Sequence, residues 1–174
     1  MTVKSPDPTM EPAPPVGNVE QIRKRLAEGW SPPVARLIGF RLEEIGRGRA
    51  KIVLRAGPRH ANPMGTLHGG ILCDIADAAM GMAYVGLISP TDSFTTIELK
   101  VNFLRPFWSG ALTARGRILR KGRMMGLLEC RITDEKRRLV AYATSTCMTL
   151  PGTPGEGLTR PRGGSNFRRA TVKG

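Results

Sequence analysis

Long apolar runs are missing from this sequence of 174 residues. No window holds the roughly 18 to 20 uncharged apolar residues that a membrane-spanning helix requires, and the N-terminal region lacks the apolar core of a secretory signal. Both observations disfavour a membrane protein and an exported protein. We therefore expect a soluble protein of the cytoplasm.

Cysteine and histidine are also scarce. The three cysteines, Cys73, Cys130 and Cys147, lie in apolar or strand-like segments and show none of the short spacings that bind zinc. We expect them to be reduced residues of the core. The sequence gives no reason to expect a metal or an organic cofactor.

Acidic residues are few, at 14 against 27 Lys and Arg, so the formal net charge is +13. This excess predicts attraction to a polyanion such as nucleic acid, an anionic membrane surface or a phosphorylated ligand. Residues 155–174 hold five of the basic residues and one acidic residue, a net +4. Nucleic-acid binding is disfavoured, because no reader motif is present and aromatics, at 5% of the chain, offer little base stacking.

The chain length fits a single globular domain. Residues 1–18 hold five prolines and no apolar period, and residues 151–174 are rich in Gly, Pro and Arg. Such compositions bury too little apolar surface to fold, so we expect both ends to be disordered. The domain itself is expected over residues 19–150.

Apolar periodicity predicts the elements of this domain. A short amphipathic helix is expected at 19–29, with a further turn at 31–37, and the segment 68–87 is apolar or small on nearly every side, which is typical of a buried helix. Six segments have strand character, and the last four resemble a meander: 40–46, 49–56, 94–104, 111–121, 124–133 and 137–150. One buried helix with about six antiparallel strands is an α+β design.

The segment most informative about function is 62–77, NPMGTLHGGILCDIAD. It consists of a polar loop, two glycines and a carboxylate some two turns into the buried helix. The first amide groups of a helix lack intrahelical partners and carry a positive dipole, so an oxyanion can be bound there. Glycine also lets a substrate carbonyl approach the backbone closely.

Asp77 needs an explanation, because a lone carboxylate among small apolar residues is costly to bury. It could act as a base or nucleophile on a carbonyl held at the glycine turn, or it could be a structural carboxylate at a subunit interface. For Asp74 the structural interpretation is the stronger one, since it lies closer to the helix start. His68 could polarise a substrate or satisfy loop backbone groups, and His60 is interpreted as a loop residue.

Asn62, Gly65, His68-Gly69-Gly70 and Asp77 together resemble the signature of hotdog-fold acyl-coenzyme A thioesterases of the PaaI-like, phenylacetate-pathway type. The resemblance spans roughly residues 35–150 and includes the strand that ends in FLRP at 103–106. It implies the hotdog fold, in which an antiparallel sheet wraps around one long central helix. It also implies a homodimer, doubled to a homotetramer, with active sites across the subunit interface.

The resemblance further implies hydrolysis of an acyl-CoA thioester to free acid and CoA. It assigns the oxyanion N–H to Gly69 and the role of general base or nucleophile to Asp77, which faces the glycine turn of the other subunit. Asn62 matches the residue that positions water, and His68 the one that orients the turn. Thr96 takes the approximate position of an assisting hydroxyl.

The phosphates of CoA require cations near the mouth of the acyl site. The candidates for contacts with CoA, on the resemblance and on their charge, are Gly70, Arg105, Arg120, Lys121 and Arg123. For the basic residues among them, the alternative is an ordinary solvated hairpin.

Two questions stay open at the level of the sequence. The chain could be a non-catalytic hotdog module that binds acyl-CoA, although the helix carboxylate argues against this. The acyl group could be phenylacyl, hydroxybenzoyl or medium-chain fatty acyl, in a tunnel shaped by Met80, Tyr84, Phe94 and Trp108.

Overall fold

The computed structural model describes residues 19–152, so the ends expected to be disordered lie outside the described residues apart from 151–152. The described elements run α1 (Val19–Ala27), α2 (Pro33–Ile38), β1 (Phe40–Gly46), β2 (Arg49–Ala56), η1 (Pro58–His60), α3 (Gly69–Val85), β3 (Ser93–Phe103), β4 (Gly110–Lys121), β5 (Met125–Asp134) and β6 (Leu139–Leu150). Each expected helix and strand is present, with similar ends.

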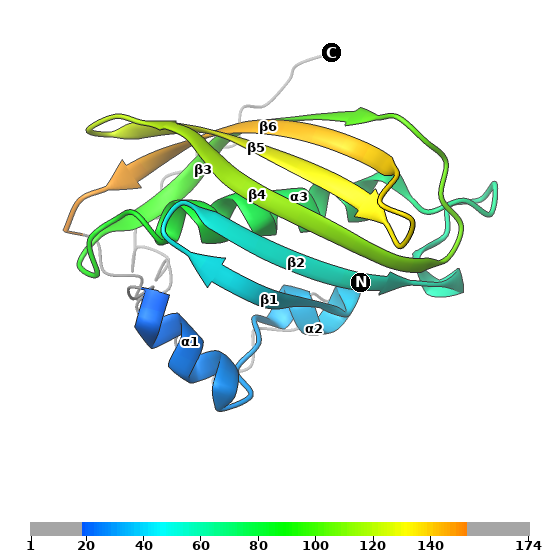
Figure 1. The fold of residues 1–174 in the computed structure, drawn as a ribbon, viewed down its shortest axis with the longest axis horizontal. Helices are drawn as coiled ribbons and strands as arrows, with labels where there is room; N and C mark the ends of the chain where they lie inside the picture. The colour runs from blue at the N-terminus through cyan, green and yellow to red at the C-terminus, as the bar shows by residue number, and fades with distance from the viewer. Residues whose placement is uncertain (1–18, 153–174) are drawn as a thin grey trace, which may run out of the picture.

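All six strands form one antiparallel sheet in the order β1-β2-β4-β5-β6-β3, with α3 across its inner face (Figure 1). The fold is therefore the α+β hotdog arrangement of a sheet around one long helix, as the sequence predicted. The expected meander is wrong for its first strand, because β3 pairs with β6 and not with β4. The reason is that α3 separates β2 from β3 in the chain and delivers β3 to the far edge of the sheet.

The core lies between α3 and the inner face of the sheet. Alternate residues of β2 and β4 are buried there, among them Ile52, Leu54 and Leu112. From α3, Ile75 and Met80 are wholly buried against them. Removing side chains of this size from water stabilises the fold by about 1.5 to 3 kcal/mol each.

Two glycines of the sheet let α3 lie unusually close. A Cβ on Gly116 of β4 would stand 2.4 Å from the carbonyl oxygen of Ala79, and a Cβ on Gly126 of β5 would stand 2.6 Å from the ring of Tyr84. Both glycines lie on the inner face, opposite the helix. Because these two residues have no side chain, α3 can pack at this distance from the sheet.

The N-terminal helices pack at the β1 edge. Ile22 of α1 forms a small buried cluster with Ile45 of β1 and Val85 of α3, and Ala35 of α2 joins the main core. Gly39 ends α2 in the left-handed conformation, with φ of 91°. The two helices thereby cover the space between α3 and β1.

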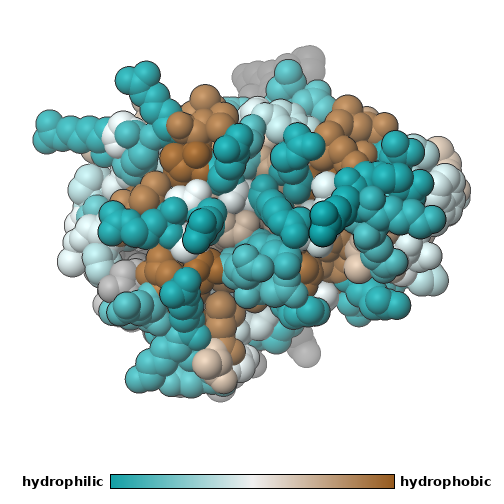
Figure 2. Space-filling model, viewed as in Figure 1, coloured by the Kyte–Doolittle hydropathy of each residue, from teal (hydrophilic) through white to brown (hydrophobic). Residues whose placement is uncertain are grey.

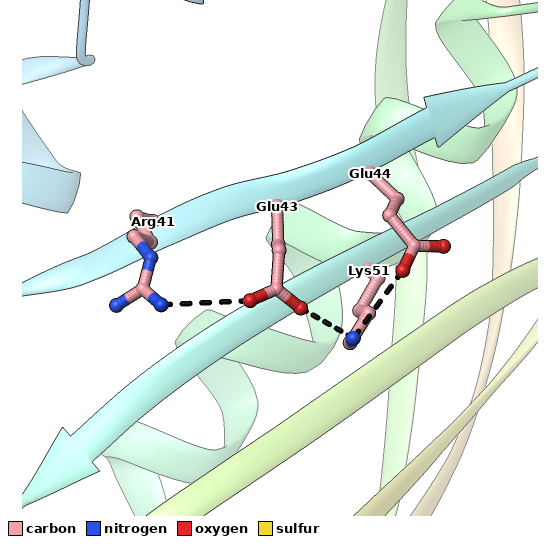
Figure 3. A network of polar contacts seen from close by, with 4 residues as sticks. All are labelled: Arg41, Glu43, Glu44 and Lys51. Carbon is pink, nitrogen blue, oxygen red and sulfur yellow. Dashed lines mark hydrogen bonds and ion pairs between the residues drawn. The ribbon is translucent and has the colours of Figure 1, made fainter.

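The outer face of the sheet carries many charged side chains, and Figure 2 shows hydrophilic residues there with apolar patches between them. On β1 and β2, Lys51 forms ion pairs with Glu43 and Glu44, and Arg41 also reaches Glu43 (Figure 3). The hydrogen bond from Lys51 is the largest of the effects that lower the pKa of Glu43. These exposed pairs contribute little to stability.

Candidate active site

Asp77 lies on α3, partly buried, and faces the edge strand β3. The hydroxyl of Thr96 on that strand donates a hydrogen bond of 2.9 Å to Oδ1 of Asp77. The strand bulges between Thr96 and Glu98, which interrupts the regular register with β6 at this point. The structure thus brings together the carboxylate and the hydroxyl that the sequence singled out.

A cavity of about 530 Å³ opens beside Asp77. Its lining comes from α3, from β1, β2 and β3, and from α1, α2 and the segment that joins these two helices. The apolar part of the lining includes Trp30, Phe40, Leu42, Met82 and Phe94. This is a pocket of the size that small organic ligands occupy, with mostly apolar walls and a few polar groups.

Asp74 is the second carboxylate on the wall of this cavity. Asp74 is exposed in the single chain, and its partial desolvation, followed by the charge of Asp77, raises its pKa above the ordinary value. The Asp74 side chain makes no hydrogen bond or ion pair with any residue that the structure describes. Among these residues and solvent, therefore, only water can donate hydrogen bonds to its carboxylate.

The glycine turn lies at the start of α3, as the sequence predicted. His68 is the N-cap residue, and its Nδ1 accepts a hydrogen bond of 2.9 Å from the Gly70 N–H. Within the described residues the Gly69 N–H has no acceptor, and a Cβ at Gly69 would stand 2.9 Å from the ring of Phe103. His68 thus orients the turn and leaves one amide free at the positive end of the helix.

Asn62 holds the loop before this turn in shape. Its Oδ1 accepts hydrogen bonds from the backbone N–H groups of Met64 at 2.9 Å and Thr66 at 3.2 Å, and its Nδ2 donates to the Thr66 hydroxyl at 2.8 Å. Gly65 completes the turn with φ of 82°. In a single chain, therefore, the polar atoms of Asn62 are engaged within the loop.

His60 lies in the predicted loop, yet it is buried. Its Nδ1 accepts a hydrogen bond of 3.0 Å from the Gly57 N–H, and its Nε2 lies 2.8 Å from the carbonyl oxygen of Ile38. This pattern requires the tautomer with the proton on Nε2. His60 therefore ties the loop to the end of α2 and has a structural place outside the cavity.

One chain does not bring Gly69 and Asp77 together. Eight residues of helix separate them, a rise of about 12 Å. A donor and a base that act on the same carbonyl must each come within about 3 Å of the reacting atoms. The edge strand β3 beside Asp77 is open to a second chain, and its residues Ile97 and Phe103 are 52% and 57% exposed.

The expected CoA contacts fall at two ends of the sheet. Arg120, Lys121 and Arg123 lie at the β4–β5 turn, whereas the Arg105 N–H bonds Val140 at the start of β6, about 30 Å away along that strand. Lys121 is engaged locally. Its Nζ donates to the Gly122 carbonyl at 2.9 Å and lies 5.1 Å from the centroid of the Tyr84 ring.

Of the four residues expected to shape an acyl tunnel, one lines the cavity and the other three lie elsewhere. Phe94 lines the cavity. Met80 and Tyr84 are wholly buried in the core, and Trp108 is 60% exposed. Sequence reasoning missed Trp30, although an aromatic residue in a polar, proline-containing link between two short helices was a signal that could have found it.

No cluster of potential metal ligands occurs within residues 19–152. None of the helices in this part of the chain has both the length and the apolar character needed to cross a membrane. The three cysteines carry free thiols, and burial raises the pKa of Cys130 to about 12. The arrangement therefore favours carboxylate chemistry over thiolate chemistry.

Known proteins resemble this chain in sequence and in fold. The medium/long-chain acyl-CoA thioesterase YigI of Escherichia coli is 27% identical over 131 residues, which cover 67% of this chain and 84% of YigI. The solved structure of a phenylacetic acid degradation-related protein of Ralstonia eutropha is 30% identical, with a TM-score of 0.65, covering 72% of this chain and 97% of that one.

The PaaI protein from the phenylacetic acid degradation operon of E. coli has the same fold. The two chains superpose with a TM-score of 0.68 at 22% identity, over 78% of this chain and 95% of PaaI. Residues 64–141 match the thioesterase superfamily, and this range contains the glycine turn, Asp77 and Thr96. This chain is therefore a hotdog-fold member of the thioesterase superfamily.

Proposed function

We propose that this chain hydrolyses acyl-CoA thioesters to the free acid and CoA. The observation that carries the proposal is the Asp77 carboxylate, hydrogen-bonded by Thr96 at 2.9 Å on the wall of an apolar cavity. A carboxylate in this position can act on a thioester carbonyl whose acyl group enters the cavity. YigI, a relative of this chain, is an acyl-CoA thioesterase, which supports the same reaction.

Asp77 can perform this reaction in two ways. As a general base it takes a proton from water, and the hydroxide attacks the carbonyl carbon and displaces the CoA thiolate. As a nucleophile it attacks the carbon itself and displaces the CoA thiolate, which gives a mixed anhydride that water then hydrolyses to the free acid and the Asp77 carboxylate. In either case Thr96 binds one carboxylate oxygen and leaves the other for the reaction.

We propose that the active site forms between two copies of the chain. Gly69 of a second copy supplies the oxyanion N–H, because the Gly69 of the same chain is about 12 Å along the helix from Asp77. The exposed apolar side chains of the β3 edge support a dimer in which two sheets join there. His68 then acts by orienting this turn, and a doubling of the dimer gives the expected tetramer.

Asn62, like Gly69, lies in the loop region at the start of α3, so the second copy also carries it to the site. We propose that it positions the attacking water once the dimer has formed. Gly70 and the cations Arg105, Arg120, Lys121 and Arg123 are proposed to contact the pantetheine and phosphates of CoA. The free thiols agree with a reducing, cytoplasmic location.

The cavity volume of about 530 Å³ suits an arylacyl or a medium-chain acyl group. The relatives point to both classes, since one is related to phenylacetic acid degradation and another acts on medium and long chains. The deciding experiment is therefore thiol release from a panel of aryl and fatty acyl-CoAs. It compares the wild type with Asp77→Asn, and Asp92→Asn, which is not part of the cavity lining, controls for the loss of a carboxylate.

We expect the wild type and Asp92→Asn to release CoA and Asp77→Asn to be slower by about 100-fold or more, the usual size of a general-base contribution. Circular dichroism and gel filtration confirm that the variants keep their fold and assembly. Unchanged turnover in Asp77→Asn overturns the role of Asp77. Tight binding of acyl-CoA without thiol release by the wild type favours a non-catalytic binding module instead.

A further inference from the structure

We propose that Asp74 is a specificity residue of this site and accepts a hydrogen bond from a donor group, such as a hydroxyl, on the acyl chain. The inference rests on the proposed function, because the acyl group must enter the cavity beside Asp77. It adds to that function a preferred substrate class, namely acyl groups that carry a hydrogen-bond donor several bonds from the thioester carbonyl.

The positions of the two carboxylates carry the first step. Asp74 and Asp77 are three residues apart on α3, so their Cβ atoms lie about 5 to 6 Å from each other on neighbouring parts of the helix surface. Both line the same cavity. An acyl group whose carbonyl meets Asp77 can therefore place a later part of its chain against Asp74.

The chemistry of the wall carries the second step. Apolar side chains such as Trp30, Met82 and Phe94 line the cavity together with Asp74. Among the described residues of this lining, the one basic residue is Arg41, which donates a hydrogen bond of 3.5 Å to Glu43. An ionised carboxylate can only accept hydrogen bonds. A hydrocarbon chain would displace the water bound to Asp74 without forming a hydrogen bond in its place, and this desolvation is costly. A hydroxyl group on the chain would instead donate a hydrogen bond to the carboxylate.

The simplest structural explanation for Asp74 is weak in this fold. A negative side chain favours the N-terminus of a helix, but this effect falls off within the first turn. Asp74 is the sixth residue of α3, counted from Gly69, and lies beyond that turn. Desolvation and the neighbouring Asp77 both raise its pKa, so the site disfavours the charge while no substrate is bound.

The test compares matched substrates on the full-length protein. We would measure kcat/KM for phenylacetyl-CoA against 4-hydroxyphenylacetyl-CoA, and for octanoyl-CoA against 3-hydroxyoctanoyl-CoA. The enzymes are the wild type, Asp74→Ala, Asp74→Leu and the control Asp92→Asn. The readout is the preference ratio within one preparation, which does not depend on how much of a variant is folded.

We expect the wild type and Asp92→Asn to prefer the hydroxylated member of at least one pair by about tenfold or more, the size of a hydrogen bond to a charged group. In Asp74→Ala and Asp74→Leu the ratio falls to about one or below. A wild-type ratio near one in both pairs, or a ratio that survives in the Asp74 variants, overturns the proposal alone. No CoA release by the wild type from any of the four overturns the proposed function and this inference with it.

Discussion

The hydroxyl of Thr96 and the carboxylate of Asp77 are joined by a hydrogen bond of 2.9 Å between β3 and α3. The bond links the edge strand of the sheet to the central helix. It restricts the rotamer of a partly buried carboxylate. The other oxygen of Asp77 is thereby held in one direction, as the proposed attack on a carbonyl requires.

Loss of this hydroxyl should lower turnover. We expect Thr96→Val to reduce kcat by about tenfold, since a hydrogen bond to a charged group contributes about 1.5 to 3 kcal/mol, while Thr96→Ser retains most of the activity. Steady-state kinetics on one good acyl-CoA substrate measure the change. Equal rates for the Val and Ser variants would remove Thr96 from the site.

The depth of the cavity should set the acyl length. We expect Ala78→Leu, which adds volume to the cavity wall, to lower kcat/KM for long acyl groups more than for short ones, and Trp30→Ala to widen the range accepted. A series of straight-chain acyl-CoAs measures this profile. Parallel losses at every chain length would show that the acyl group lies elsewhere.

Glycine at position 116 should be required for stability. We expect Gly116→Ala to lower the free energy of unfolding by about 1 to 3 kcal/mol, as overpacking does, because its Cβ would meet Ala79 at 2.4 Å. Gly57→Ala is the matched control, with φ of −160° and no atom near its Cβ. Urea unfolding compares the two, and similar losses in both would contradict the close approach of α3.

Glu129 should make stability depend on pH. It is only 8% exposed and accepts hydrogen bonds from the Tyr142 hydroxyl at 2.6 Å and from Arg117 Nε at 2.5 Å, and these bonds lower its pKa. The folded state therefore favours the ionised form. Its contribution to stability is complete above the ordinary carboxyl pKa and is lost as pH falls through the lowered value.

Substitution of Glu129 separates this effect from other carboxylates. We expect Glu129→Gln to be less stable than the wild type near neutral pH and to lose less stability on acidification. Thermal unfolding from neutral pH down to about pH 3, below the ordinary carboxyl pKa, follows both proteins. Parallel curves would assign the acid sensitivity to other groups.

Asp74 should show the opposite dependence. Its pKa is raised, so the folded state favours the protonated form and pays increasingly for the charge as pH rises through the raised value. Because solvent screens this exposed carboxylate, we expect Asp74→Asn to be only slightly more stable than the wild type at neutral pH and equal to it in acid, below the ordinary Asp pKa. A variant less stable at neutral pH would indicate that Asp74 has a structural partner.

Local patterns in the sequence predicted the elements well. The strands follow from alternation of buried and exposed residues, and α3 follows from its apolar composition and the glycine turn. The edge position of β3 could not be read in the same way, because pairing with β6 depends on where α3 delivers the chain. Strand order is a tertiary property that neighbouring residues do not encode.

The candidate site was predicted in part for the same reason. Asp77 was singled out by its residue type and spacing and Thr96 by the family resemblance, and the structure places the two side chains in contact. The cavity wall was not found, because an all-round apolar helix does not show which side meets the sheet. Met80 and Tyr84 therefore pointed to the wrong side of α3, and Trp30 was missed.

The wall contributed by the link between α1 and α2 lies before the first strand and outside the range that matches the superfamily. Asp77, Thr96 and the glycine turn all lie inside that range. One part of the cavity wall and the residues proposed for hydrolysis thus lie in separate stretches of one polypeptide. We expect an exchange of the N-terminal helices between related chains to change the acyl group that the cavity accepts, because this wall changes while Asp77 and Thr96 stay in place.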